Sequence, residues 1–109
     1  MYISISRTAP SRITTVSLTK IMLERYKPSL TVTWSEPKSD VGISNYQVEY
    51  RKSEDTEWIP GPTLSHSMTF TNLPALTAGT VYSIRVRAMS AVGAGNWSNA
   101  QIERTYNCK

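Results

Sequence analysis

The stretch that decides the fold is TVYSIRVRAM, at residues 80–89 of a chain of 109 residues. Its apolar and polar residues alternate one by one, and a tryptophan, Trp97, follows after a short loop of small residues. Successive side chains of a strand point to opposite faces, so this alternation predicts a strand with one buried and one exposed face. The buried face would carry Tyr82, Ile84, Val86 and Ala88, and the exposed face Ser83, Arg85 and Arg87.

A period of two recurs along the rest of the chain and predicts six further strands, separated by breaks rich in Pro, Gly and Ser. Trp34 falls on the buried face of the second strand, and Tyr46, Val48 and Tyr50 on that of the third. Residues 18–26 place apolar side chains at helical spacing, but they lack a strong cap and end against a proline. We expect an extended loop there, with at most one turn. The six predicted strands are residues 12–18, 29–35, 45–52, 56–59, 67–73 and 97–106.

Composition fits one soluble all-β domain. The chain is 39% hydrophobic with a mean hydropathy of −0.32, which is typical of a globular domain rather than a disordered segment. Many short strands predict two antiparallel sheets packed face to face. No apolar run approaches the roughly 20 residues of a membrane-spanning helix, so we expect no membrane insertion by this domain. We place the domain at residues 10–106, with a linker at residues 1–9 and a tail at residues 107–109.

The net charge is +4, from 12 basic and 8 acidic residues. The basic residues are spread along the chain, whereas nucleic-acid binding usually needs a clustered patch. We therefore expect no nucleic-acid partner. A mild positive charge remains compatible with an acidic protein or a heparan-type glycan.

Few residues are suited to catalysis or to holding a cofactor. The chain has one histidine, His66, and one cysteine, Cys108, whereas a zinc site or a catalytic triad needs several convergent side chains. One cysteine cannot form an internal disulfide, and its pairing outside this chain stays open. Glu54, Asp55 and Glu57 gather in a polar turn that offers no cleft. We expect no enzymatic activity, no cofactor and no metal.

Several short motifs, in a fixed order, carry a family resemblance. They are SLTVTWSEP at 29–37, YQVEYR at 46–51, EW at 57–58, LTAGTVY at 76–82, RVRA at 85–88 and GAGNWS at 93–98. Together they resemble a fibronectin type III domain over nearly the whole chain. Ala78 stands where the family commonly has a proline, and either Leu73 or Leu76 can be the leucine before the corner tyrosine.

The resemblance implies a seven-stranded antiparallel immunoglobulin-like β-sandwich. It also implies that the Tyr82 hydroxyl bonds the backbone near Leu76 or Thr77. The core residues would be Trp34, Tyr46, Val48, Tyr50, Tyr82, Ile84 and Val86.

The function that the resemblance implies is a non-catalytic protein-interaction or spacer module of an extracellular receptor or cell-adhesion protein. Its partners would be the neighbouring domains of its own chain and a protein ligand that the sequence does not identify. Two alternatives stay open. One is a spacer in a cytosolic giant muscle-type protein, and the other is an accessory domain of a secreted glycan-degrading enzyme.

Three surface features are candidate sites. If the Trp97 ring points outward, it can stack on Arg85 and Arg87 in a cation–π ladder. Asn96 begins the tripeptide Asn-Trp-Ser, an N-glycosylation acceptor in a secreted protein. A basic face for an acidic partner or a heparan-type glycan could include Arg51, Lys52, Arg85 and Arg87, with Arg104 as a further member. The alternative is a solvated face with cross-strand charge pairs.

The loop before Trp97 contains Gly93 and Gly95. Both are predicted to adopt positive φ angles where the chain reverses. The chain contains no Arg-Gly-Asp tripeptide, so integrin binding by that signal is not implied.

Overall fold

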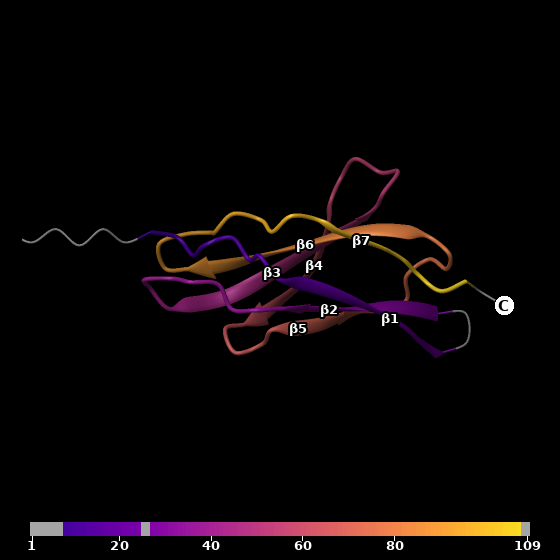
Figure 1. Ribbon diagram of the computed structural model, residues 1–109, viewed down its shortest axis with the longest axis horizontal. Coiled ribbons are helices and arrows are strands. Elements are labelled where there is room, and N and C mark those ends of the chain that lie inside the picture. The colour runs from indigo at the N-terminus through magenta and orange to yellow at the C-terminus, as the bar shows by residue number, and fades with distance from the viewer. Residues whose placement is uncertain (1–7, 25–26, 108–109) are drawn as a thin grey trace, which may run out of the picture.

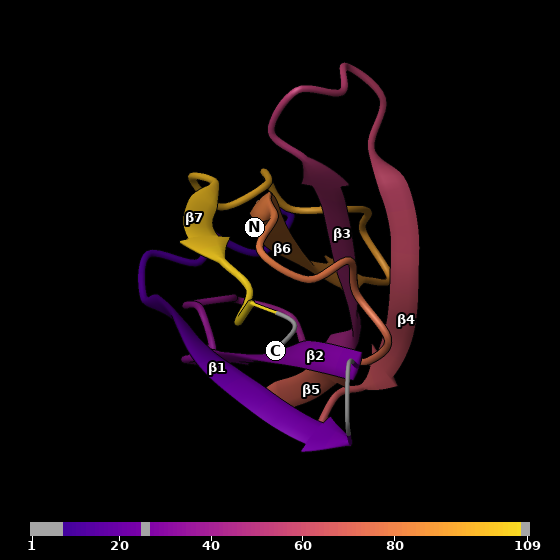
Figure 2. The same cartoon turned by 90° about the vertical axis from the view of Figure 1, so that its right-hand side faces the viewer.

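The computed structural model of the protein describes residues 8–24 and 27–107, which form seven strands in two antiparallel sheets. Figures 1 and 2 show the sheets as two layers packed face to face. The three-stranded sheet has the order β1-β2-β5, with β1 (Val16–Glu24), β2 (Lys27–Trp34) and β5 (Phe70–Leu73). The four-stranded sheet has the order β4-β3-β6-β7, with β3 (Ile43–Lys52), β4 (Ile59–Ser65), β6 (Val81–Ser90) and β7 (Gln101–Arg104). This architecture confirms the predicted immunoglobulin-like sandwich. Within the described ranges there is no helix long and apolar enough to cross a membrane.

The core lies between the sheets and is built from the inward residues of β2, β3 and β6. Trp34 is 3% exposed, and its ring centroid lies 5.3 Å from that of the fully buried Tyr46. Burial of large apolar side chains is the main favourable term in closing two such layers. The other buried members from the predicted core are Val48, Tyr82, Ile84 and Val86.

Tyr82 closes one end of this core. Its hydroxyl accepts a hydrogen bond from the backbone N–H of Thr77 at 2.9 Å, at one of the two residues where a partner was expected. Its ring centroid lies 6.2 Å from that of Tyr50, which is only partly buried and packs against the edge of the core. Leu73 and Leu76 are both buried, so both leucines before this corner contribute to the core.

The prediction of a loop between the first two strands was wrong. β1 occupies most of residues 18–26 and pairs with β2 as far as Glu24 opposite Lys27, with a shift in register between Met22 and Glu24. Val16 and Leu18 pack against the core, as the period of two requires. Pairing with β2 satisfies the backbone N–H and C=O groups of this segment. This pairing favours a strand over the helix that the spacing of the apolar side chains would allow.

β4 also differs from its prediction. The expected strand at residues 56–59 was to end at Pro60, but β4 begins at the end of that segment and runs through Pro60 and Pro62. β4 is the edge of its sheet, where a missing proline N–H leaves no ladder bond unmade. The register of β4 shifts opposite the interval between Gln47 and Glu49. The edge position and this irregularity together accommodate the two prolines.

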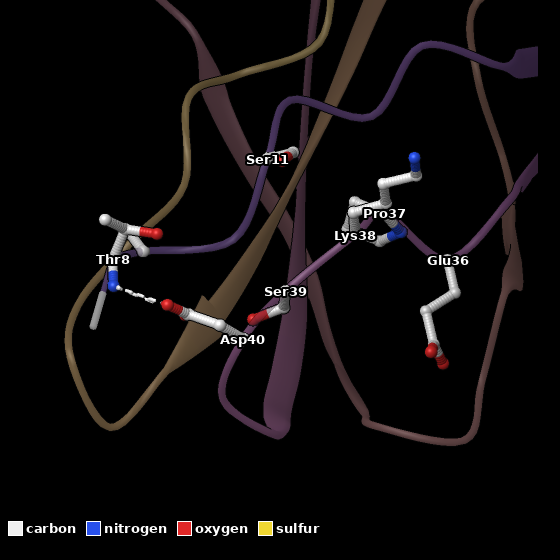
Figure 3. A pocket seen from close by; sticks show the side chains of 8 residues that line it. Thr8, Ser11, Glu36, Pro37, Lys38, Ser39 and Asp40 are labelled. Atoms are coloured by element: carbon white, nitrogen blue, oxygen red, sulfur yellow. Dashed lines mark hydrogen bonds between the residues drawn. The ribbon is translucent and has the colours of Figure 1, made fainter. Parts of the chain in front are cut away.

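The segment before β1 is docked against a connecting loop. The backbone N–H of Ser11 donates a hydrogen bond to the carbonyl oxygen of Lys38 at 2.9 Å. The backbone N–H of Thr8 donates to Oδ1 of Asp40 at 3.3 Å, as Figure 3 shows. Both acceptors lie in the connection between β2 and β3, so that connection fixes the direction in which the chain enters the domain.

The prediction of a positive φ was wrong for Gly95, the second glycine of the loop. Gly93 has φ of +148°, but Gly95 does not have a positive φ. A Cβ atom on Gly95 would lie only 2.5 Å from the carbonyl oxygen of Pro10. Pro10 is buried, and Ile13 beyond it is 1% exposed. Gly95 is therefore needed for the close approach of the entering segment and not for a chain reversal.

The two ends of the described chain lie at opposite ends of the long axis of the sandwich (Figure 1). The chain enters beside the connection between β2 and β3 and leaves after β7.

Candidate functional site

The outer face of the four-stranded sheet carries the predicted arginine side chains. Arg51 lies on β3, and Arg85 and Arg87 lie on β6. The register of this strand pair sets Glu49 opposite Arg85 and Gln47 opposite Arg87. Because the residues between them point into the core, all five side chains project from the face turned away from the other sheet.

Two indole rings lie between the three guanidinium groups. The Trp97 ring centroid is 4.4 Å from Cζ of Arg85 and 4.4 Å from Cζ of Arg87. The Trp58 ring centroid is 4.2 Å from Cζ of Arg85 and 4.9 Å from Cζ of Arg51. These distances are within the range of favourable cation–π contacts. The stack runs Arg51, Trp58, Arg85, Trp97, Arg87, and we call these five residues the ladder.

Hydrogen bonds hold the edges of two guanidinium groups while the rings hold their faces. Oε1 of Glu49 accepts hydrogen bonds from Nε and Nη2 of Arg85, at 3.0 and 2.6 Å. Oε1 of Gln47 accepts a hydrogen bond from Nε of Arg87 at 2.8 Å. Each of the two β6 arginines is thus fixed by the residue opposite it on β3.

Trp97 is positioned by the residue that follows it. The backbone N–H of Ser98 donates a hydrogen bond to the carbonyl oxygen of Val86 at 2.8 Å. The Ser98 hydroxyl in turn accepts one from the backbone N–H of Val86 at 3.0 Å. This two-way pairing fixes Ser98, which is 6% exposed, beside β6 although residues 97–100 lie before β7 and not within it. The last strand is accordingly shorter than predicted.

Trp58 is the ladder residue that sequence reasoning missed. It was assigned to the short fourth strand, but it lies in the connection between β3 and β4. Nη1 of Arg51 donates hydrogen bonds to the carbonyl oxygens of Ser53 and Asp55, which folds this connection back toward the sheet. The number of outward arginines could have indicated Trp58. One indole ring can stack on two guanidinium groups, so three outward arginines call for a second aromatic ring.

Lys52 does not belong to the predicted basic face. It pairs with Tyr82 in the β3–β6 register, and it shares the parity of the inward residues of β3, so it points to the opposite side from Arg51. Arg104 instead donates a hydrogen bond from Nη1 to the carbonyl oxygen of Gly79 at 2.8 Å. The structure thus brings together only three of the five basic residues, and Glu49 offsets the charge of one of them.

Asn96 is exposed at the start of the Asn-Trp-Ser tripeptide. The side chain of the third residue, Ser98, is buried by its pairing with β6. N-glycosylation of Asn96 stays a prediction. The Cys108 pairing question falls on a residue outside the described ranges.

One buried phenol in the core has a shifted pKa. Burial raises the pKa of the Tyr46 hydroxyl above its ordinary value, and the negative charge of Glu36 raises it further. Glu54, Asp55, Glu57 and His66 are exposed. Within residues 8–24 and 27–107, no group of three or more His, Cys, Asp or Glu side chains is arranged to hold a metal ion.

Curated proteins of two kinds resemble this chain. It is 36% identical over 77 residues to the sortilin-related receptor of Oryctolagus cuniculus, which covers 70% of this chain and 3% of the receptor. It is 29% identical over 97 residues to ephrin type-A receptor 7 of Gallus gallus, covering 88% and 9% of the two chains. It is 32% identical over 69 residues to myosin-binding protein H of Mus musculus, covering 62% and 14%. The chain therefore spans only a small part of the length of each relative.

A solved structure and a family model agree with the fold. The crystal structure of domains A168–A170 from titin matches with a TM-score of 0.78 at 24% identity, over 93% of this chain and 34% of that one. A likeness at that identity shows the fold alone. The family model for the fibronectin type III domain matches residues 9–104, which is most of the chain. The chain therefore belongs to the fibronectin type III domain family.

Proposed function

We propose that this domain is a non-catalytic module of an extracellular receptor or cell-adhesion protein, in which it spaces its neighbours and offers surface for protein contact. The observation that carries the spacing role is the position of the chain ends at opposite ends of the sandwich (Figure 1). Such a module transmits distance and direction from one neighbour to the next. The docked entry segment, with Ser11 bonded to Lys38, supports a defined rather than a free orientation.

The side chains of the ladder favour a structural and binding role over catalysis. Glu49 is engaged by Arg85 through two hydrogen bonds, and Arg85 is covered on both faces by indole rings. General acid–base chemistry needs a group that is free to exchange a proton with a bound substrate. A guanidinium stacked and ion-paired in this way serves poorly for that task.

The extracellular setting is supported by relatives that are themselves named as receptors, the sortilin-related receptor and ephrin type-A receptor 7. A second candidate setting is a cytosolic spacer of the muscle type, which the identity to myosin-binding protein H supports. Both settings use the same fold and the same opposed chain ends. They differ in the side of the membrane on which the domain resides.

An antibody against this domain tests the setting on cells that express the full-length protein. We expect it to stain intact cells, because the epitope would face outward. Antibody to tubulin should stain the same cells only after permeabilisation and so reports membrane integrity. Staining by the domain antibody that also requires permeabilisation would reject the extracellular setting and favour the cytosolic spacer.

A further inference from the structure

A hollow of about 220 Å³ lies at the Arg87 end of the ladder. β3 and the edge strand β4 line one side of it, and Trp97 and Arg87 of the ladder line the other. Its lining includes Gln47, Pro60, Gly61, Thr63, Trp97 and Arg87. The ladder and the edge strand thus form two walls of one depression on the outer face.

The hollow is open because of the residues that β4 places there. Gly61 has no side chain, and a Cβ atom at that position would lie 2.8 Å from the carbonyl oxygen of Val48. Pro60 and Pro62 lack the backbone N–H groups through which an added strand would pair with this edge. A partner at this place must therefore bind through its side chains rather than by extending the sheet.

Arg87 presents an oriented cation to the hollow. One face of its guanidinium is stacked on Trp97 at 4.4 Å, and Nε donates to Gln47 at 2.8 Å. Its two terminal nitrogens have no hydrogen-bond acceptor among the described residues. The carboxylate among the lining residues, that of Glu49, is already paired with Arg85. A rigid guanidinium with free N–H groups matches the planar, two-oxygen geometry of a carboxylate.

We propose that this hollow binds an Asp or Glu side chain of a partner protein. The terminal N–H groups of Arg87 donate to the partner's carboxylate, and the methyl and ring carbons of Thr63 and Pro60 contact its stem. The proposal names the chemistry of the protein partner and therefore rests on the protein-contact role proposed above.

The distribution of charge favours a single carboxylate over a sulfated glycan. A polyanion needs several accessible cations in a row. Here the middle arginine of the ladder is neutralised by Glu49, and Lys52 projects from the other side of the sheet. The far end of the ladder adjoins the exposed acidic residues Glu54, Asp55 and Glu57 of the β3–β4 connection. Arg87 is thus the accessible cation, and its neighbours in the hollow are neutral or already paired.

Two matched peptide libraries displayed on phage test the proposal with the 109-residue chain as bait. The peptides of one library carry a fixed central Glu, and those of the other a fixed central Gln, in otherwise random sequence. We expect only the Glu library to yield binders. These should bind the Arg87→Gln variant at least tenfold more weakly, since the charge-assisted pair is lost.

Two further variants separate the hollow from the ladder as a whole. Thr63→Trp fills the hollow and leaves every ladder residue in place, so it should also weaken binding at least tenfold. Arg51→Gln removes the opposite end layer of the ladder and should leave binding within twofold. The unfolding midpoint of each variant shows that it is folded at the assay temperature.

Three results would overturn the proposal. The first is a failure of the Glu library to enrich above the Gln library. The second is an equal loss of binding in Arg51→Gln and Arg87→Gln. The third is heparin hexasaccharide binding that depends on both end arginines. The last result would assign the face to a glycan. None of these bears on the cell-staining result, which tests the extracellular setting independently.

Discussion

Oε1 of Glu49 accepts two hydrogen bonds from Arg85, from Nε at 3.0 Å and from Nη2 at 2.6 Å. The same guanidinium lies between the rings of Trp58 and Trp97. Arg85 therefore links β3, β6, the β3–β4 connection and the segment after β6 through one side chain. These side-chain contacts hold the outer face of the four-stranded sheet in addition to the backbone hydrogen bonds between its strands.

Replacing Trp97 by alanine should lower the free energy of unfolding. The ring contacts Arg85 and Arg87, and two exposed cation–π contacts are together worth about 1–2 kcal/mol. Trp97→Phe keeps an aromatic face between the two guanidinium groups and should lose less than half as much. Urea denaturation of the three proteins measures both effects. An alanine variant as stable as the parent would show that the ladder adds nothing to stability.

Replacing Glu49 by glutamine should have a smaller and salt-dependent effect. The side chains of Glu49 and Arg85 are 24% and 25% exposed, and pairs of this kind contribute about 0.2–1 kcal/mol. The difference between the parent and Glu49→Gln should shrink from 20 mM to 1 M NaCl because salt screens the charge. Glu54→Gln, in the exposed turn, is the control that should change stability at neither salt concentration. A Glu49→Gln deficit that is independent of salt would mean that packing, not charge, holds the pair.

Alternation predicted the core better than the strand boundaries. The inward residues of β3 and β6 follow from the period of two, because a slip by one residue would expose all of them. The extent of β1 could not be read in that way. Its apolar residues include a set at helical spacing, and the pairing with β2 decides for the strand. The predicted fourth strand stopped at residue 59, before Pro60 and Pro62, because the tolerance of prolines at a sheet edge depends on the strand order.

The candidate site also has a part that alternation predicts and a part that depends on the folded chain. The stacking of Trp97 with Arg85 and Arg87 could be proposed from parity and from the adjacency of the last two strands. Trp58 could not be placed, because its position depends on the folding of an irregular connection. The error over Lys52 was avoidable. Lys52 shares the parity of the inward residues of its own strand, and the sequence alone contains that information.

Replacing Tyr82 by phenylalanine should cost about 0.5–1.5 kcal/mol, the usual net value of one hydrogen bond. The hydroxyl accepts from the backbone N–H of Thr77 at 2.9 Å, and the ring stays in place in the variant. The Thr77 amide should also exchange with solvent faster, which hydrogen exchange followed by NMR detects residue by residue. Unchanged stability together with unchanged exchange at Thr77 would contradict the role given to this corner.

Replacing Tyr46 by phenylalanine should change the dependence of stability on high pH. The pKa of Tyr46 is raised above 10.0, first by burial and then by Glu36, so the folded state holds the phenolic proton more tightly than the unfolded state. This contribution is fully present below the unfolded pKa and is lost as the pH rises through the folded pKa. The parent should therefore lose stability more steeply than Tyr46→Phe above pH 10.

At neutral pH the same variant should be nearly as stable as the parent or more stable. The Tyr46 hydroxyl is buried and has no hydrogen-bond partner among the described residues, so its removal sacrifices no bond. Urea denaturation at pH 7 and at several values above pH 10 measures both effects. If the stabilities of the two proteins fell in parallel at high pH, ionisation of Tyr46 would not be the cause of the loss in the parent.

Replacing Gly95 by alanine should release the entering segment from the domain. The added Cβ would lie 2.5 Å from the carbonyl oxygen of Pro10. Neither atom can rotate away, because the Cβ is fixed to its backbone and the oxygen belongs to the backbone, so one of the two segments must move. Docking of residues 8–13 weakens as a result, and trypsin should cleave after the exposed Arg12 several times faster than in the parent. Gly42→Ala is the matched control, because a Cβ there meets no atom within 4 Å, and it should leave the cleavage rate unchanged. Equal cleavage rates in all three proteins would show that the entering segment is not held by its approach to Gly95.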